Sequence, residues 1–133
     1  MTDSTSPAGA SVPSAIPAAP VAPEQKPLVS YETFAQLDLR VATVLEAREH
    51  PNANKLLLLK IQVGEVVKQI VAGIKAHYDP QSLVGTQIVV VNNLEPAMLR
   101  GEESQGMLLA ASDANGLALV RPEKPLASGA KVK

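Results

Sequence analysis

An alternation of apolar and polar residues begins at Leu39 and runs to Arg48. The apolar positions of this stretch, which would share one face of an extended strand, are Leu39, Val41, Leu45 and Ala47. The polar positions, which would share the opposite face, are Arg40, Glu46 and Arg48. Because the side chains of a strand alternate between its two faces, the pattern predicts a strand with one mainly buried face.

A hairpin is predicted after the turn sequence His50-Pro51-Asn52-Ala53-Asn54. Its first strand has alternating apolar residues at Leu57, Leu59, Ile61 and Val63. Gly64-Glu65 then separates this strand from an apolar run, Val66 to Ala72. Glycine takes a positive φ without steric cost, which suits the first position of a two-residue turn. We therefore expect the two strands to pair antiparallel.

Four further elements follow from turn residues and apolar runs. Gly73 ends the third strand, and Asp79-Pro80 predicts a short helical or irregular excursion before Gly85. Thr86 to Val91 is apolar enough for a strand buried on both faces. The last two elements are a hairpin, with strands Met107 to Ala111 and Leu117 to Val120 around Asp113-Ala114-Asn115-Gly116, and a helix from Ser30 to Leu37 with Ser30 as its cap.

Short strands at roughly 10-residue spacing, with turn signals between them, favour an all-β fold, either a small sandwich or a partly open barrel. The five-stranded oligonucleotide/oligosaccharide-binding (OB) barrel fits the number of strands best. The alternation alone does not distinguish these two architectures. We predict a five-stranded OB-fold barrel with short helical excursions and a C-terminal hairpin extension.

The chain has 133 residues, which suits one domain and leaves room for a tail. Residues 1–27 contain six Pro, six Ala and four Ser, and we predict a disordered Pro/Ala-rich tail or linker there. Residues 28–133 form the predicted domain. The basic start and continuous apolar stretch of a secretory signal are missing from this N-terminus, and no stretch is long enough to cross a bilayer.

The composition excludes several kinds of binding and catalytic site. Lys and Arg number 12 against 13 Asp and Glu, so any site for an anion must be local. Without Cys there is no disulfide, thiolate metal site or cysteine nucleophile, and with one Phe, two Tyr and no Trp there are few rings for bases to stack on. No phosphate loop, dinucleotide fingerprint or serine elbow is present. His50 and His77 lack a metal-ligand pattern and are interpreted as loop or surface residues, and we expect no catalysis, metal or cofactor.

Two segments are candidates for a functional role in addition to a structural one. The first is the long connection from Asn92 to Met107, since long ordered connections in compact domains are often functional. The second is the turn from His50 to Lys55. Each, taken alone, is also typical of an ordinary turn.

Several short motifs in order closely resemble the tRNA-binding domain family, over about residues 30 to 133. They are Phe34, Leu37-Asp38-Leu39-Arg40-Val41, Pro51-Asn52-Ala53-Asn54-Lys55-Leu56, Ile70-Val71-Ala72-Gly73-Ile74, Tyr78, Leu83-Val84-Gly85, Val89-Val90-Val91-Asn92-Asn93-Leu94 and Ser104-Gln105-Gly106-Met107-Leu108-Leu109-Ala110-Ala111. That family includes the C-terminal domain of bacterial methionyl-tRNA synthetases, a free-standing tRNA-binding protein and a dimeric export-related chaperone. The ending, from Gly116 to Pro122 and from Ser128 to Lys133, looks most like the synthetase-appended form.

The resemblance implies an OB barrel that forms a homodimer and grips tRNA by shape. The family's RNA contacts map onto Lys55, Arg100, Ser104 and Met107, with Asn52 and Asn93 as weaker candidates. Lys55 and Arg100 would neutralise phosphates, Ser104 would bond a phosphate or a 2′-hydroxyl, and Met107 would lie against a base or ribose. Glu102 and Glu103, which put negative charge beside this site, depart from what an RNA site favours.

The first hypothesis is a cytoplasmic, non-catalytic tRNA-binding subunit or domain of methionine-tRNA ligase, acting beside a catalytic chain. Because the sequence starts at Met1, it resembles a separately encoded beta subunit, although a Pro/Ala-rich lead also suits a linker. The second is a chaperone-like, export-related dimer that binds peptides in the barrel groove. The third, a sugar or small-ligand binder, rests on the analogy of the fold alone.

Overall fold

The computed structural model describes residue 20 and residues 25–133. Most of the predicted tail, residues 1–19 and 21–24, lies outside the described residues. The helices are α1 (Tyr31–Phe34) and α2 (Pro80–Leu83). The strands are β1 (Leu39–Glu49), β2 (Leu57–Val63), β3 (Val66–Ala72), β4 (Gln87–Val91), β5 (Ala97–Leu99), β6 (Glu102–Ser104), β7 (Met107–Leu108), β8 (Ala110–Asp113), β9 (Gly116–Leu119) and β10 (Lys131–Val132).

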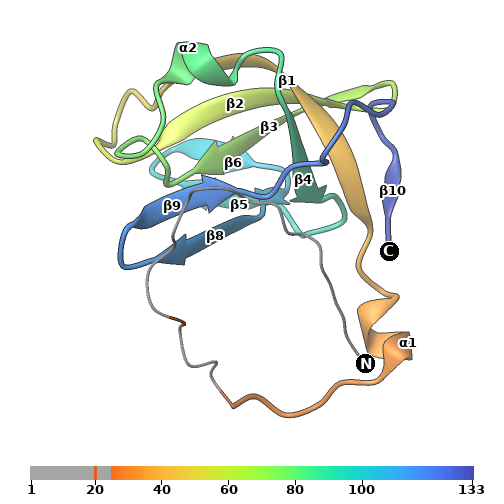
Figure 1. The fold of residues 1–133 in the computed structure, drawn as a ribbon. Coiled ribbons are helices and arrows are strands. Elements are labelled where there is room, and N and C mark those ends of the chain that lie inside the picture. Colours follow the sequence, from red (N-terminus) through yellow and green to blue (C-terminus); the bar gives the residue numbers. More distant parts are fainter. Residues whose placement is uncertain (1–19, 21–24) are drawn as a thin grey trace.

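The main sheet has the strand order β3-β2-β1-β4-β7, with β10 added along the start of β1 (Figure 1). All its pairs are antiparallel. The sheet curls around a core, which agrees with an OB-like barrel and confirms the predicted all-β class. None of the helices in the described part of the chain is long and apolar enough to cross a membrane.

The β2–β3 hairpin confirms the prediction from the alternation. Val63 pairs with Val66, so Gly64 and Glu65 form a two-residue turn, and Gly64 has the positive φ of 65° that was expected of it. The core side chains of β2 are Leu57, Leu59, Ile61 and Val63, as predicted. β4 is buried along most of its length, as its apolar run indicated.

β1 departs from the predicted pattern. Its register with β2 shifts between Val44 and Glu46, which makes Leu45 the extra residue of a β-bulge, and the Leu45 side chain is exposed. Before the bulge the core residues are Ala42 and Val44, whereas after it Ala47 packs against the core. The prediction that Leu39, Val41, Leu45 and Ala47 share one buried face is therefore wrong, because the inserted residue puts the positions before and after it out of phase. Val41 is buried, but it is not part of the core cluster.

The core is aliphatic and comes from every long strand. Its buried members are Ala42, Val44, Leu57, Leu59, Ile61, Val63, Ile70, Ala72, Ile74, Leu83, Ile88, Val90 and Leu119. Tyr78 packs against it and uses its hydroxyl to accept a hydrogen bond from the Leu119 amide at 3.1 Å. Burial of this much aliphatic surface is the main favourable term for the fold.

The free edge of β3 is closed by the last residue of β6 and the residue that follows it. The Gln105 amide donates to the Gln69 carbonyl at 2.8 Å, and the Gln69 amide donates to the Gln105 side-chain oxygen at 3.0 Å. The Val71 amide donates to the Ser104 hydroxyl at 3.0 Å. Side-chain oxygens thus replace part of the backbone ladder and complete the barrel.

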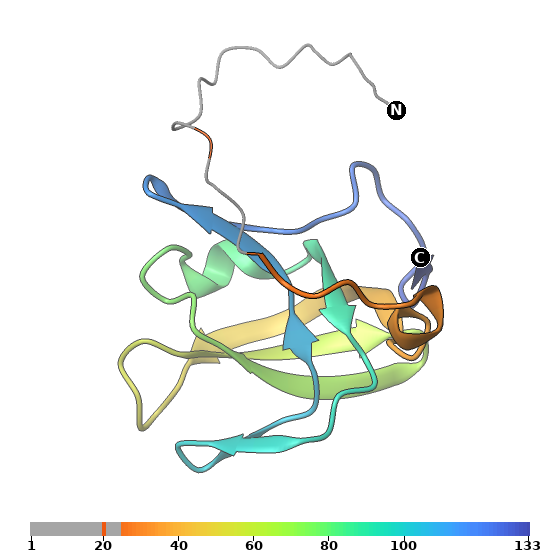
Figure 2. The ribbon, with the colours of Figure 1, turned by 90° about the horizontal axis from the view of Figure 1, so that it is seen from below.

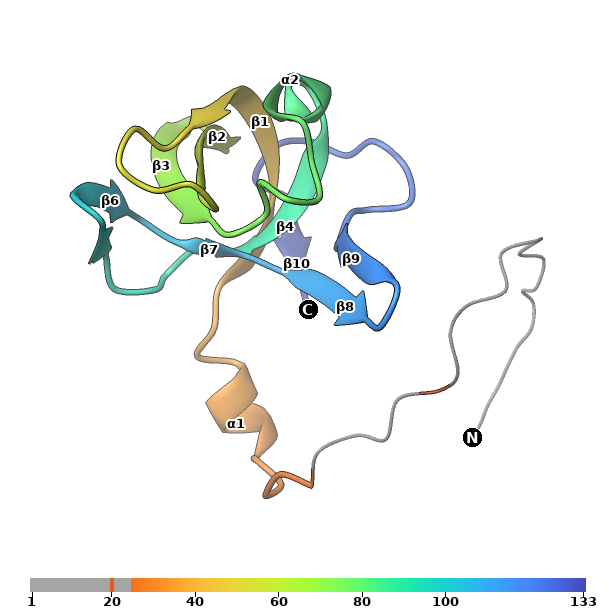
Figure 3. The ribbon, with the colours of Figure 1, turned by 90° about the vertical axis from the view of Figure 1, so that its left-hand side faces the viewer.

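The predicted final hairpin exists, but its first strand is split in two. β7 pairs with β4, whereas β8 pairs with β9 around the turn at Ala114 and Asn115. Figure 2 shows this hairpin projecting from the barrel on the side opposite to the β5–β6 hairpin. The predicted helix is shorter than expected, with the Ser30 hydroxyl accepting from the Thr33 amide as its cap, and α1 stands clear of the barrel (Figure 3).

Candidate nucleic-acid interface

The two segments singled out from the sequence lie against each other. The long connection folds into the β5–β6 hairpin, which the sequence did not predict, and its tip meets the loop of residues 50–56 (Figure 3). The Arg100 guanidinium donates to the Asn52 carbonyl at 3.3 Å, and the Asn52 side chain lies beside Gly101. The fold therefore brings residues almost fifty positions apart into one surface.

Arg100 occupies the first position of the tight turn between β5 and β6. Leu99 pairs with Glu102, and the two turn residues, Arg100 and Gly101, have φ values of 56° and 91°. Two positive φ values are the signature of a type I′ turn, which favours Asn-Gly or Asp-Gly. Arg100 is the one non-glycine residue with a positive φ in the described part of the chain. A side chain in this region costs roughly 1 to 2 kcal/mol, so the turn carries strain at its tip.

Lys55 and Arg100 face the same hollow. This depression of about 390 Å³ is lined by Ala53, Asn54, Lys55, Leu56 and Arg100. Both basic side chains are exposed, and the rest of the lining is largely apolar. Two cations at the rim of an open hollow can neutralise phosphates of a polyanion. The structure thus brings together the two basic residues predicted for the site.

His50 lies in the loop of residues 50–56, as expected, but it is buried, with only 4 % of its surface exposed. Its Nδ1 accepts a hydrogen bond from the Asn52 amide at 2.9 Å. Its Nε2 lies 2.9 Å from the Leu99 carbonyl oxygen. No pattern in the sequence indicates this role, because both partners are backbone groups. His77 is exposed, as expected.

Two exposed methionine side chains lie close to Arg100 in the sequence. Met107, the first residue of β7, is 46 % exposed, and Met98 of β5 is 65 % exposed. Flexible thioether side chains adapt to irregular surfaces such as the face of a base or a ribose. Met107 is therefore available for the contact that the resemblance implied, and Met98 is an additional candidate that sequence reasoning missed.

Ser104 and Asn93 make internal bonds. The Ser104 hydroxyl, 5 % exposed, donates to the Gly106 carbonyl at 2.9 Å while accepting from Val71. The Asn93 amide group accepts from the Asp38 amide at 2.8 Å and donates to the Gln36 carbonyl at 2.7 Å. Direct RNA contacts from these two residues stay predictions, and each would require the side chain to leave its internal partners. Asn52, by contrast, is exposed beside Arg100.

The charges around the site are only partly balanced within the protein. The Glu102 carboxylate accepts from the Gln69 side chain at 3.2 Å, and Lys75 forms an ion pair with Glu49 at 3.2 Å. At the base of the long connection, a hydrogen bond from the Asn92 side chain, reinforced by Arg40, holds the pKa of Asp38 below its usual value of 3.8. Asp38 is therefore a carboxylate at neutral pH and anchors Asn92, the first residue of the connection.

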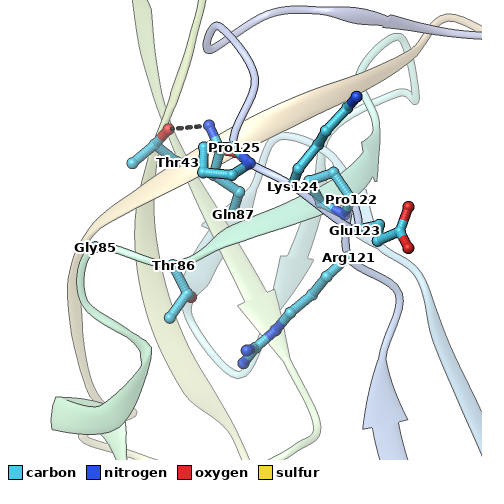
Figure 4. A pocket seen from close by; sticks show the side chains of 9 residues that line it. All are labelled: Thr43, Gly85, Thr86, Gln87, Arg121, Pro122, Glu123, Lys124 and Pro125. Carbon is cyan, nitrogen blue, oxygen red and sulfur yellow. Dashed lines mark hydrogen bonds between the residues drawn. The ribbon is translucent and has the colours of Figure 1, made fainter. Parts of the chain in front are cut away.

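A second hollow, of about 420 Å³, lies between β4 and the segment that follows β9 (Figure 4). It contains two basic residues, Arg121 and Lys124, together with Glu123. Figure 4 shows the Arg121 side chain running past Thr86 while Lys124 points the opposite way. Because the two cations diverge, this hollow is a poorer phosphate site than the one at Lys55 and Arg100.

Comparison with known proteins identifies relatives of this chain. Residues 39–131 match the model of the putative tRNA-binding domain family. The chain is 50% identical over 105 residues to methionine-tRNA ligase of Pyrococcus horikoshii, a match that covers 79% of this chain and 14% of that enzyme. The chain therefore spans about one seventh of the length of the ligases that it matches.

Solved structures share the whole barrel. A MetRS-related protein from Pyrococcus horikoshii superposes with a TM-score of 0.76 at 30% identity, covering 81% of this chain and all of that one. Chaperone CsaA from Bacillus anthracis strain Ames superposes with a TM-score of 0.73 at 35% identity, covering 80% of this chain and all of that one. The same fold thus carries proteins described in two different ways.

Proposed function

The chain belongs to the putative tRNA-binding domain family, and from this premise we propose that it is a non-catalytic tRNA-binding subunit or domain of methionine-tRNA ligase. It acts in the cytoplasm, next to a catalytic chain or body that carries the active site. By holding tRNA nearby it raises the effective concentration of tRNA at that active site. The ligase relatives, in which the matching part is a small fraction of the length, support this assignment.

The observation that carries the proposal is the conformation of Arg100. An arginine in a left-handed turn position is strained, and Asn or Gly would fit the turn better. Strain of this kind concentrates at functional sites. The exposed guanidinium beside Lys55 gives a reason for keeping arginine there, since together the two groups bind phosphates of the tRNA backbone.

The tRNA is recognised by shape rather than by sequence. Lys55 and Arg100 contact phosphates, Met107 lies against a base or ribose, and Asn52 supports Arg100 through its carbonyl. Ser104 and Asn93 complete the proposed set of RNA contacts from the family resemblance. With so few cations, roughly two to four phosphates are neutralised per monomer, and affinity falls accordingly as salt rises.

We further propose that the protein is a homodimer. The C-terminal hairpin is not free to supply the apolar contact, because Leu119 lies in the core and Leu117 packs against it. The larger exposed apolar surface is at the N-terminal segment, where Leu28 is 98 % exposed and Tyr31 76 % exposed, with Val29, Phe34 and Leu37 also exposed. An exposed apolar set of this kind favours association, and a second copy would bury it. Sedimentation should show twice the chain mass at micromolar concentration.

A chaperone-like dimer that binds unfolded peptides is the second candidate. The likeness to the CsaA chaperone over that protein's full length favours it, as do the exposed Met98 and Met107. A pull-down separates the two candidates. Recovery of the methionine-tRNA ligase catalytic chain supports the first, whereas recovery of unfolded client proteins without it supports the second.

Fluorescence anisotropy with unfractionated tRNA tests the proposal at the residue level. Replacement of Lys55 or Arg100 by Ala should weaken binding by about 1 to 2 kcal/mol each, because a phosphate contact is lost. Lys124→Ala and Arg121→Ala are matched controls from the second hollow, and should bind like the parent. If all four variants bind alike, the site at Lys55 and Arg100 is not the RNA site.

A further inference from the structure

His50 joins the two segments that carry the basic residues. Its Nδ1 accepts a hydrogen bond from the Asn52 amide, and its Nε2 lies within hydrogen-bond distance of the Leu99 carbonyl oxygen, each at 2.9 Å. Asn52 supplies the carbonyl that Arg100 bonds, and Leu99 is the residue directly before Arg100. The imidazole thus fixes the backbone on both sides of the contact between the loop and the hairpin.

The chemistry of the two partners defines the state of the ring. A backbone amide can only donate and a carbonyl can only accept, so Nδ1 has no proton and Nε2 carries one. This is the neutral imidazole in a single tautomer. With 4 % of its surface exposed, His50 offers little of its ring to water that could replace either bond.

We propose that His50 is a positioning residue, a neutral buried latch that holds Lys55 and Arg100 at the spacing required to bind RNA. The inference rests on the proposed function for its RNA readout. Lys55 lies five residues after His50 in the loop, and Arg100 lies at the strained tip of the hairpin. Without the latch, each segment moves independently, and Lys55 and Arg100 are no longer held at a fixed spacing in the free protein.

Two substitutions separate the two bonds. In His50→Gln the side-chain amide nitrogen is as far from the backbone as Nε2, so it still donates to the Leu99 carbonyl. In His50→Asn the side-chain oxygen takes the place of Nδ1 and still accepts from the Asn52 amide, but nothing reaches Leu99. The chain provides a matched control, His77→Gln, because His77 is the other histidine and is exposed.

The latch predicts that His50→Gln keeps tRNA affinity within about threefold of the parent, whereas His50→Asn loses about tenfold. His77→Gln binds like the parent. Because the latch acts through Arg100, His50→Asn should cause little additional loss in an Arg100→Ala background. Equal affinity of His50→Asn and the parent, or full additivity with Arg100→Ala, overturns the proposal.

Nuclear magnetic resonance supplies a readout that needs no RNA. The His50 nitrogens of the parent should show Nδ1 without a proton and Nε2 with one, and the Arg100 and Gly101 amides should exchange faster in His50→Asn than in His50→Gln. If the parent fails to bind tRNA while these amides respond as expected, the proposed function fails and the latch stands. If the amides exchange equally in both variants, the latch is wrong whatever the RNA result.

Discussion

Two tight turns of this protein have the same length and opposite character. The turn between β2 and β3 places Gly64 at the position with positive φ, followed by Glu65, and the sequence predicts it directly. The turn between β5 and β6 places Arg100 at a positive φ, with Gly101 after it. The first turn fits its backbone without strain, whereas the second turn stores strain in its leading residue.

The difference shows how structural and functional turns can be told apart. The backbone of Gly64 is packed against the C-terminal segment, because a Cβ added at Gly129 would lie 2.6 Å from the Gly64 nitrogen. Arg100 faces outward, next to Lys55. Substitutions at the first turn should therefore change stability, and substitutions at the second should change binding.

The largest expected effect is at the packed turn. In Gly129→Ala the added methyl group meets the backbone of Gly64, and the φ of 93° at position 129 is one that alanine disfavours. We expect the free energy of unfolding to fall by about 3 kcal/mol. Urea denaturation measures this loss, and a midpoint unchanged from that of the parent would show that the C-terminal segment does not pack on the turn.

Ser104→Ala should have the next largest effect on stability. Ser104 lies where the strained hairpin joins the barrel. The substitution leaves the buried Val71 amide without its acceptor, which costs about 2 kcal/mol of stability. Thermal unfolding and tRNA binding should be measured on the same sample. Full stability of the variant would contradict the structural role of Ser104, and unchanged affinity would contradict its proposed RNA contact.

Gly64→Ala should cost about 1 kcal/mol of stability, since alanine is strained at a φ of 65° but has open space around its Cβ. The affinity for tRNA, measured well below the unfolding temperature, should stay that of the parent. Glu65→Ala, one residue on, is the control for changes at this turn that leave φ untouched. Weaker tRNA binding by Gly64→Ala would break the division between the two turns.

The sequence predicts the first turn well and the second poorly, for physical reasons. Apolar residues at every second position from Leu57 to Val63 and a glycine at the turn define the β2–β3 hairpin. The β5–β6 hairpin has strands of three residues and an Arg-Gly turn, so neither periodicity nor turn chemistry predicts it. The bulge at Leu45 was missed because one inserted residue reverses the faces without changing the composition.

The fold brings two of the predicted site residues together. Lys55 and Arg100 were identified by family resemblance, and the structure places them at one hollow. The role of His50 could not be predicted from the sequence, because its hydrogen-bond partners are backbone atoms and one of them is forty-nine positions away. Ser104 and Asn93 were also assigned by family resemblance, and their internal hydrogen bonds could not be predicted because they depend on contacts that only the folded chain makes.

The central claim is that Arg100 is kept in a strained turn for its contact with RNA, and Arg100→Asn tests it most directly. Asparagine suits a type I′ turn, so the variant should unfold with a free energy about 0.5 to 1 kcal/mol higher than that of the parent. The same sample should bind tRNA about tenfold more weakly, because the phosphate contact is lost. A variant that is more stable and binds tRNA as tightly as the parent would contradict the claim.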